Sequence, residues 1–212
     1  MTIRSLAVGR PQLMTSKQDR TITTGIKKTT IKEVELELSG FHNDDVGNKK
    51  NHGGVDRAVC FYPFEHYAMW EHEHGKTLPF PAFGENLTVS TMLESDVCIG
   101  DVYRIGEAIV EISQGRVPCA TINLYTSSSQ LLARFIETGY TGYFGRVLQR
   151  GKITDQSSIA LLQRDDFKVS VLHATRTLFL GEDVTEMKMI QSIPSLSKEW
   201  KNRFEKKLLK KS

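Results

Sequence analysis

Short apolar runs separated by Gly, Asp and Ser fill most of the first two thirds of the chain. Residues 34–38 alternate apolar and acidic side chains, which is the period-2 pattern of a strand with one buried face. Residues 58–62 form a continuous apolar run, typical of a strand that is buried on both faces. The expected strands are residues 3–8, 34–38, 58–62, 86–89, 97–103, 108–112 and 158–162. Many short strands without regular helical crossovers favour a mostly β fold with some α, built as a closed or semi-closed barrel.

The same pattern predicts two helices among these strands. Pro63 suits the first position of a helix, and aromatic side chains follow it at near-helical spacing until Gly75. The second expected helix, residues 129–138, places its apolar side chains on one face and closes on Gly139. Both helices are short and interrupt the series of strands. They do not alternate regularly with single strands.

The last fifth of the chain changes to helical periodicity. Ser170 is a candidate N-cap, and Asp183 with Glu186 matches a capping box. Four apolar residues then stand four apart in a lysine-rich segment: Leu196, Trp200, Phe204 and Leu208. We therefore expect a β-barrel domain over residues 1–165, followed by a small C-terminal three-helix bundle over residues 168–212.

The positive charge of the chain is concentrated at its C-terminal end. The formal net charge is +3 over 212 residues, and residues 198–212 hold seven of the 28 Lys and Arg residues but only two of the 25 acidic ones. Such a tail is compatible with nucleic-acid binding. A solvated helix face explains the same residues, and we favour this second interpretation.

Composition and motif content exclude several classes of protein. Hydrophobic residues make up 39% of the chain and charged residues 25%, which is ordinary for a globular protein and excludes wholesale disorder. No stretch approaches the ~18–20 apolar residues that span a bilayer, which excludes a membrane protein. The N-terminus has no apolar signal segment, and three cysteines without C-x-x-C spacing favour a reducing cytoplasm over a disulfide framework. Neither a G-x-G-x-x-G nor a P-loop motif occurs, so neither kind of nucleotide site is indicated.

Residues 49–57 combine a glycine pair with positive side chains. Two successive glycines let the backbone approach a ligand closely, and their N–H groups can bind an anion. The surrounding cations suit a phosphate or another oxyanion. A glycine turn between strands, flanked by solvated lysines, is the alternative. The candidate anion-binding residues are Lys49, Lys50, His52, Gly53, Gly54 and Arg57.

Cys119 is the candidate reactive cysteine. It follows the expected strand 108–112 and stands three residues after Arg116, and a cation near a strand end favours the thiolate. A thiolate can attack as a nucleophile or bind a soft metal. Cys60 and Cys98 lie within apolar strand patterns, which favours a packing role for both. From the residues alone, packing is an equal alternative for Cys119.

Two other segments carry candidate site residues. Glu85 and Asn86 directly precede an expected strand, either as site residues or as part of an ordinary turn. Residues 138–146 combine glycines, aromatic side chains and Arg146, a composition that suits the wall around a flat heterocycle. A glycine-rich aromatic turn is the alternative for this segment.

These motifs occur in the order found in one known family. They are His52-Gly53-Gly54 followed by Arg57-Ala58-Val59, then Phe83-Gly84-Glu85-Asn86-Leu87, then Pro118-Cys119. With residues 40–44 and the turn at 100–106, they resemble the MOSC domain, named for the C-terminus of molybdenum-cofactor sulfurase. The resemblance covers about residues 1–165. The tail resembles a three-helix appendix of one bacterial subgroup, which includes proteins implicated in resistance to N-hydroxylated base analogues.

The resemblance implies a MOSC-like β-barrel that holds a molybdenum cofactor in a basic cleft. The implied cofactor is of the molybdopterin type, as a mononucleotide or without a nucleotide, and Cys119 is implied as catalytic residue and molybdenum ligand. The residues implied to bind the cofactor are Lys28, Lys49, Lys50, His52, Gly53, Gly54, Arg57, Asn86, Gln114, Arg116 and Arg146. Family members often have a second histidine before the His-Gly-Gly run, where this chain has Asn51.

The implied activity is that of an oxidoreductase which reduces small N-hydroxylated compounds such as hydroxylaminopurine. The chain has no recognisable nicotinamide, flavin or iron–sulfur site, so we expect an external electron-donor protein. The alternative is a cofactor carrier or sulfur-transfer module with a persulfide on Cys119. The family's weak association with pyridoxal phosphate comes from the large sulfurase domain, for which 212 residues leave no room. We expect no membrane partner, no nucleic-acid partner, and a cytoplasmic location.

Overall fold

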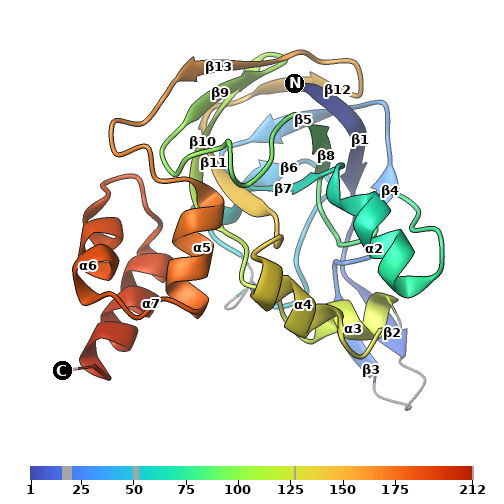
Figure 1. Ribbon diagram of the computed structural model, residues 1–212. Helices are drawn as coiled ribbons and strands as arrows, with labels where there is room; N and C mark the ends of the chain where they lie inside the picture. Colours follow the sequence, from blue (N-terminus) through green and yellow to red (C-terminus); the bar gives the residue numbers. More distant parts are fainter. Residues whose placement is uncertain (16–20, 50–52, 127, 212) are drawn as a thin grey trace.

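A curled sheet with helices packed around it forms the molecule (Figure 1). The computed structural model describes residues 1–15, 21–49, 53–126 and 128–211. The main sheet has the order β13-β9-β10-β11-β7-β8-β1-β4, in which β7 and β8 pair in parallel. Its strands are β1 (Thr2–Val8), β4 (Thr29–Thr30), β7 (Val59–Pro63), β8 (Leu87–Ser90), β9 (Val102–Ile105), β10 (Ala108–Gly115), β11 (Tyr143–Gln149) and β13 (Ile159–Gln163).

Two smaller sheets complete the β part of the fold. The first consists of β5 (Glu33–Glu37), β6 (Gly40–Phe41) and β12 (Gly151–Thr154) in the order β12-β5-β6. The second is a hairpin of β2 (Gln12–Thr15) and β3 (Thr21–Thr24). The expected mostly β fold is confirmed, with the main sheet curled into a half-barrel and helices at the C-terminal end.

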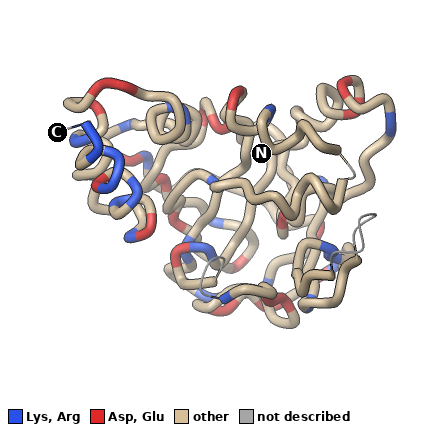
Figure 2. The backbone as a smooth tube through the Cα atoms, turned by 90° about the horizontal axis from the view of Figure 1, so that it is seen from below, with Lys and Arg blue, Asp and Glu red and all other residues tan. Residues whose placement is uncertain are grey.

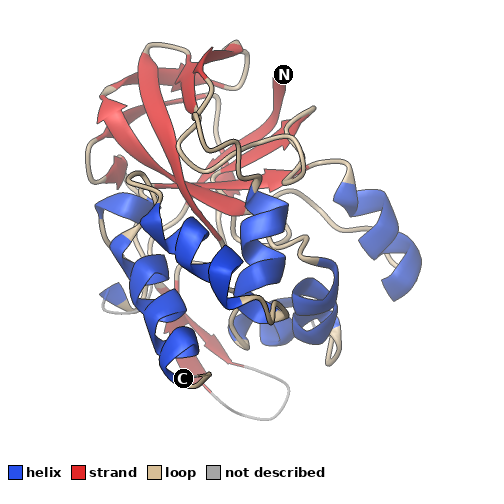
Figure 3. Ribbon diagram, turned by 60° about the vertical axis from the view of Figure 1, so that its left-hand side comes forward, coloured by secondary structure: helices blue, strands red, loops and turns tan. Residues whose placement is uncertain are grey.

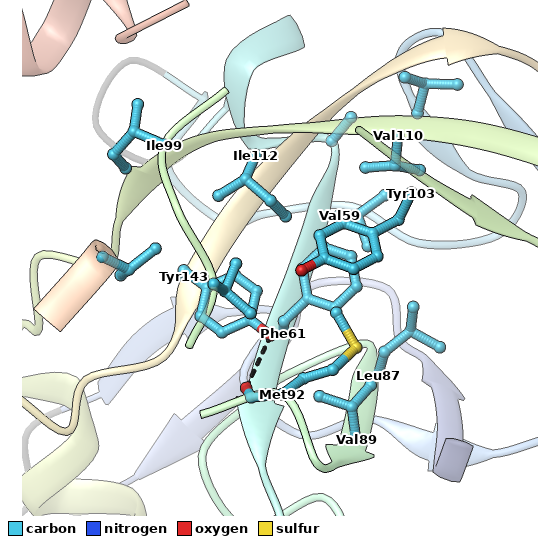
Figure 4. Close-up of a cluster of buried hydrophobic side chains, with 14 of the residues drawn as sticks. Val59, Phe61, Leu87, Val89, Met92, Ile99, Tyr103, Val110, Ile112 and Tyr143 are labelled. Carbon is cyan, nitrogen blue, oxygen red and sulfur yellow. Dashed lines mark hydrogen bonds between the residues drawn. The ribbon is translucent and has the colours of Figure 1, made fainter. Parts of the chain in front are cut away.

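The main hydrophobic core lies against the central strands of the curled sheet (Figure 4). Every residue of β7 is buried, as the continuous apolar run predicts. Phe61 of β7 stacks on Tyr143 of β11, with ring centroids 5.1 Å apart. The Tyr143 hydroxyl donates a hydrogen bond to the carbonyl oxygen of Met92 at 3.0 Å, so its one polar atom is satisfied inside the core.

Helix α2 (His66–His74) begins later than the sequence predicts. Pro63 is the last residue of β7 and pairs with Val89 of β8, so the prediction that it opens the helix is wrong. The next N–H group, that of Phe64, donates to the Val89 carbonyl at 2.7 Å and extends the parallel pairing. The helix ends as predicted, with Gly75 in the left-handed region at φ +63°.

Other elements confirm or correct the sequence pattern. Helix α4 (Leu131–Thr138) closes on Gly139 as expected. The strand expected over 97–103 begins only at Val102, because the chain bends before it and the Cys98 N–H donates to the Asp101 carboxylate at 2.8 Å. The pattern missed β11, in which Gly145 breaks the apolar run. A Cβ at Gly145 would stand 2.4 Å from the Val110 side chain, so close strand packing requires the glycine.

Three C-terminal helices pack beside the sheet (Figure 3). They are α5 (Val171–Phe179), α6 (Val184–Ser192) and α7 (Lys198–Leu209). Ser170 and Asp183 cap α5 and α6 as predicted, by accepting backbone N–H groups. Trp200 and Phe204 of α7 are fully buried in the same hydrophobic cluster as the strands, so the predicted stripe docks α7 onto the sheet. Within the described ranges, no helix has the length and hydropathy to span a membrane.

Candidate functional site

A cavity of about 1230 Å³ opens between the sheet, the β2–β3 hairpin and α7. Its wall carries six Lys or Arg residues and three Asp or Glu residues, so it suits an anionic ligand. Eight of the sequence-predicted site residues meet there. They are Lys28, Gly53, Gly54, Arg57, Asn86, Gln114, Arg116 and Cys119.

Cys119 lies on the cavity wall, in the loop between β10 and α3 (Thr121–Thr126). It is half-buried, and its carbonyl oxygen accepts the Ile122 N–H at 3.0 Å, which fixes the loop to the first turn of α3. Cys60 also lines the cavity but is buried, and burial raises the pKa of its thiol although Arg116 opposes the shift. A thiol held neutral is a poor nucleophile and metal ligand, so Cys119 is the better placed of the two.

Two buried polar groups on the wall lack a partner among the described residues. Nη1 of Arg116 and Oε1 of Gln114 are both inaccessible and make no hydrogen bond there. Gln114 is only 1% exposed. An unmade hydrogen bond at a buried group is costly, so the pair indicates a ligand that accepts from Arg116 and donates to Gln114.

Asn86 holds the cation Lys28 through a second side chain. Its Nδ2 donates to the Asp44 carboxylate at 2.9 Å, and its Oδ1 accepts the Cys60 N–H at 3.1 Å. Asp44 in turn forms an ion pair with Lys28, whose side chain is 5% exposed. Asn86 therefore fixes the position of a buried ion pair on the cavity wall.

Glu85 supports the turn before β8 instead of lining the cavity. Its fully buried carboxylate accepts hydrogen bonds from the Phe83 N–H at 3.0 Å, from the Thr88 hydroxyl at 2.9 Å and from the Tyr67 hydroxyl. The turn includes Gly84 in the left-handed region at φ +78°. This buried network sets the backbone path from which Asn86 reaches the cavity.

The glycine pair and Arg57 form a turn on the cavity wall. Gly54 has φ +113°, and a Cβ there would find no atom nearer than 4.0 Å, so the space above it is open to a ligand. Nε of Arg57 donates to the Gly53 carbonyl at 2.9 Å, and its Nη1 pairs with Glu199 of α7. Arg57 therefore joins the glycine turn to the C-terminal helix.

Comparisons with known proteins identify the family. The MOSC domain matches residues 48–160. The chain belongs to the MOSC domain family. It is 38% identical to YflK of Bacillus subtilis over 97% of this chain and 94% of that protein. It is similar in structure to YiiM of Geobacillus stearothermophilus, with a TM-score of 0.82, 33% identity and 98% of both chains covered.

A fungal relative has a name that describes an activity. A protein of Gibberella moniliformis called "Reductase" is 39% identical over 134 residues, which are 60% of this chain and 23% of that protein. The matched MOSC segment of the present chain contains Cys119, Arg116, Gln114 and the glycine turn. It contains neither Lys28 nor α7, so the cavity is completed by residues outside the MOSC match.

Some residues that the MOSC resemblance implies do not reach the cavity. Arg146 of β11 is bound to Asp56 at 2.9 Å and to Glu111 at 2.6 Å, because strand pairing sets it directly opposite Glu111. Lys49 is exposed, does not line the cavity and pairs with Asp45 at 3.0 Å. Neither side chain therefore lies on the cavity wall. Lys50 and His52 lie outside the described residues.

The aromatic segment 138–146 divides between the core and the cavity. Tyr140 stacks on His66 with ring centroids 4.0 Å apart, and Tyr143 belongs to the main core. Phe144 alone of its aromatic residues lines the cavity, as far as the described residues show. Most of this segment is thus the aromatic turn that was the alternative interpretation.

Sequence reasoning missed the contribution of α7 to the MOSC cavity. Residues on its exposed side line the wall: Lys198, Glu199, Asn202, Arg203 and Lys206. Lys198, Asn202 and Lys206 stand four apart and so share one helix face, which is the signal that the sequence did contain. The sequence pattern identified the opposite, apolar face of α7. It predicted that the polar face of this helix is exposed to solvent.

The site contains no ready-made set of protein metal ligands. Across the described ranges, no group of three or more His, Cys, Asp or Glu side chains is arranged to hold a metal ion. Cys119, the less buried of the two thiols on the wall, with cations around it suits a metal that arrives bound to an anionic cofactor better than a bare ion. The residues present therefore fit the molybdenum cofactor that the family resemblance implies.

Proposed function

We propose that this MOSC protein binds a molybdenum cofactor in the cavity and reduces N-hydroxylated compounds. The observation that carries the proposal is the half-buried Cys119 beside Arg116, whose buried Nη1 lacks a partner among the described residues. An anionic group would accept from Arg116, and a soft metal that it carries could bind the thiolate of Cys119. The reductase name of the fungal relative supports an oxidoreductase in general terms.

The chain supplies binding and orientation for the cofactor. The open space above Gly54 admits a phosphate to the backbone, and the Arg57 guanidinium and the buried Lys28 ammonium add positive charge to the same wall. Arg116 lies on the same wall as Cys119 and can hold the negative charge of a ligand there. These groups are anchored by contacts to the sheet and to α7, so little order has to be gained on binding.

The proposed reaction removes the oxygen of an N-hydroxylated amine. R–NHOH takes up two electrons and two protons, its N–O bond breaks, and R–NH₂ and water leave. When bound, the cofactor supplies this two-electron redox chemistry, with Cys119 as the protein ligand of its metal. The electrons come from an external donor protein, and hydroxylaminopurine represents the substrate class.

The test is to purify the protein from cells that make the cofactor and from cells that do not. We expect molybdenum only in the first preparation, and reduction of hydroxylaminopurine only there when an artificial electron donor is supplied. A loaded protein without any reduction would support the cofactor carrier instead. Labile sulfur on Cys119 without molybdenum would support the sulfur-transfer module.

A further inference from the structure

The α7 side of the cavity differs from the sheet side in having exposed cations. Arg203 is held by Glu199 at 2.9 Å with 45% of its side chain exposed. Lys198 and Lys206 lie on the same wall, and neither forms an ion pair within the described part of the chain. Figure 2 shows how Lys and Arg gather along this last helix. The wall therefore offers a second, exposed group of positive charges, beside the Arg57–Glu199 ion pair that joins α7 to the glycine turn.

A buried acceptor lies at the base of this wall. Gln114 directs Nε2 to Glu199 of α7 at 3.4 Å, and its Oε1 has no partner among the described residues. A fully ionised phosphate cannot satisfy Oε1, because it has no N–H or O–H group to donate. An amino or hydroxyamino group of a base would satisfy it. Arg203 and Lys206 follow Glu199 by four and seven residues. The helical rise to them is about 6–10 Å.

The cavity is larger than one small ligand usually needs. Its volume of about 1230 Å³ exceeds the roughly 300–1,000 Å³ that is usual for one drug-sized ligand. A cofactor against Cys119 and the glycine turn leaves space toward α7. The helical rise of about 6–10 Å from Glu199, which Gln114 contacts, to Arg203 and Lys206 is of the same order as the length of a nucleotide.

We propose that α7 binds the phosphate of the substrate, which is a nucleoside monophosphate with an N-hydroxylated base. The base edge donates to Gln114 Oε1, and the phosphate lies against Arg203 and Lys206. This inference rests on the proposed function for the identity of the reacting group. A phosphate monoester on the cofactor has the same chemistry, so the test must separate these two sources.

The experiment measures binding of AMP and adenosine to protein purified without cofactor, by titration calorimetry. We expect AMP to bind about ten-fold tighter than adenosine, and the double variant Arg203→Ala/Lys206→Ala to remove this preference. The matched control is Lys188→Ala/Lys210→Ala, which removes two exposed charges outside the cavity and should keep the preference.

Two outcomes would overturn the proposal. One is equal affinity for AMP and adenosine in the wild type. The other is loss of molybdenum from the Arg203→Ala/Lys206→Ala protein made in cofactor-producing cells, which would assign the phosphate to the cofactor. AMP binding requires no turnover. A wild type that prefers AMP but contains no molybdenum would therefore refute the proposed function and leave the nucleotide site standing.

Discussion

The sheet wall and the α7 wall of the cavity both carry cations but hold them differently. On the sheet side, the Lys28 side chain is 5% exposed and the Arg57 side chain 13%, and each is paired with a carboxylate. On the α7 side, Arg203 is 45% exposed, and Lys198 and Lys206 are exposed residues. Fixed, buried charges suit a ligand that stays bound, whereas exposed charges suit one that exchanges. This difference supports the proposal of a cofactor at the sheet wall and a substrate at the α7 wall.

The largest effect is expected at Cys119 on the sheet wall. Cys119→Ser should lower hydroxylaminopurine reduction to the rate of the protein-free reaction, because a protonated hydroxyl is a poor substitute for a soft thiolate. Some cofactor should remain bound through its phosphate. Cys98→Ser is the control, since Cys98 is buried, accepts a hydrogen bond from Arg164 Nη1 at 3.0 Å and lies outside the cavity. Wild-type reduction rates in Cys119→Ser would contradict the assignment.

The next largest effect is expected on cofactor retention, and it distinguishes two cations near the glycine turn. Arg57→Ala should weaken cofactor retention about ten- to a hundred-fold, because a charge-assisted contact on the cavity wall is lost. Lys49→Ala should leave retention unchanged, because Lys49 is 78% exposed and pairs with Asp45 outside the cavity. Molybdenum content of the two purified proteins measures both. Equal content in Arg57→Ala and Lys49→Ala would remove Arg57 from the site.

Asn86 tests whether the sheet wall depends on its buried contacts. Asn86→Ala removes hydrogen bonds to Cys60 N–H, the Ala7 carbonyl and Asp44, so we expect the free energy of unfolding to fall by about 1–3 kcal/mol. Molybdenum content should fall a few-fold as well, because Asp44 then positions Lys28 less well. Urea titration and metal analysis measure the two effects. Unchanged molybdenum content at reduced stability would limit Asn86 to a structural role.

Sequence patterns located the sheet wall better than the α7 wall. The apolar run of β7, the glycine turn and Cys119 are local signals, and the structure brings all three to one cavity. Pro63 was predicted to open a helix but is the last residue of β7, because β7 pairs in parallel with β8 up to this residue. That pairing is a long-range contact, which a local pattern does not encode. Arg146 does not line the cavity, because strand register sets it opposite Glu111. Which surface the polar face of α7 meets is a tertiary property that periodicity does not encode.

The smallest effect concerns the second thiol of the cavity. Burial raises the pKa of Cys60, so the unfolded chain loses its proton first as the pH rises. The contribution of the neutral Cys60 thiol to the free energy of unfolding is therefore fully present below the thiol pKa of the unfolded chain. It is lost progressively as the pH rises above that value. Between pH 8.5 and 9.5, the unfolding free energy of wild type should fall more steeply with pH than that of Cys60→Ser. Parallel pH slopes of the unfolding free energy in the two proteins would show that Cys60 does not titrate in this range.

The central claim is that Cys119 on the sheet wall binds the metal of a molybdenum cofactor. X-ray absorption at the molybdenum edge tests it most directly, on wild type and Cys119→Ser purified from the same cofactor-producing cells. The account predicts molybdenum in both proteins and one sulfur neighbour fewer in the variant. Identical sulfur neighbours in the two spectra, or the absence of molybdenum from wild type, would contradict it.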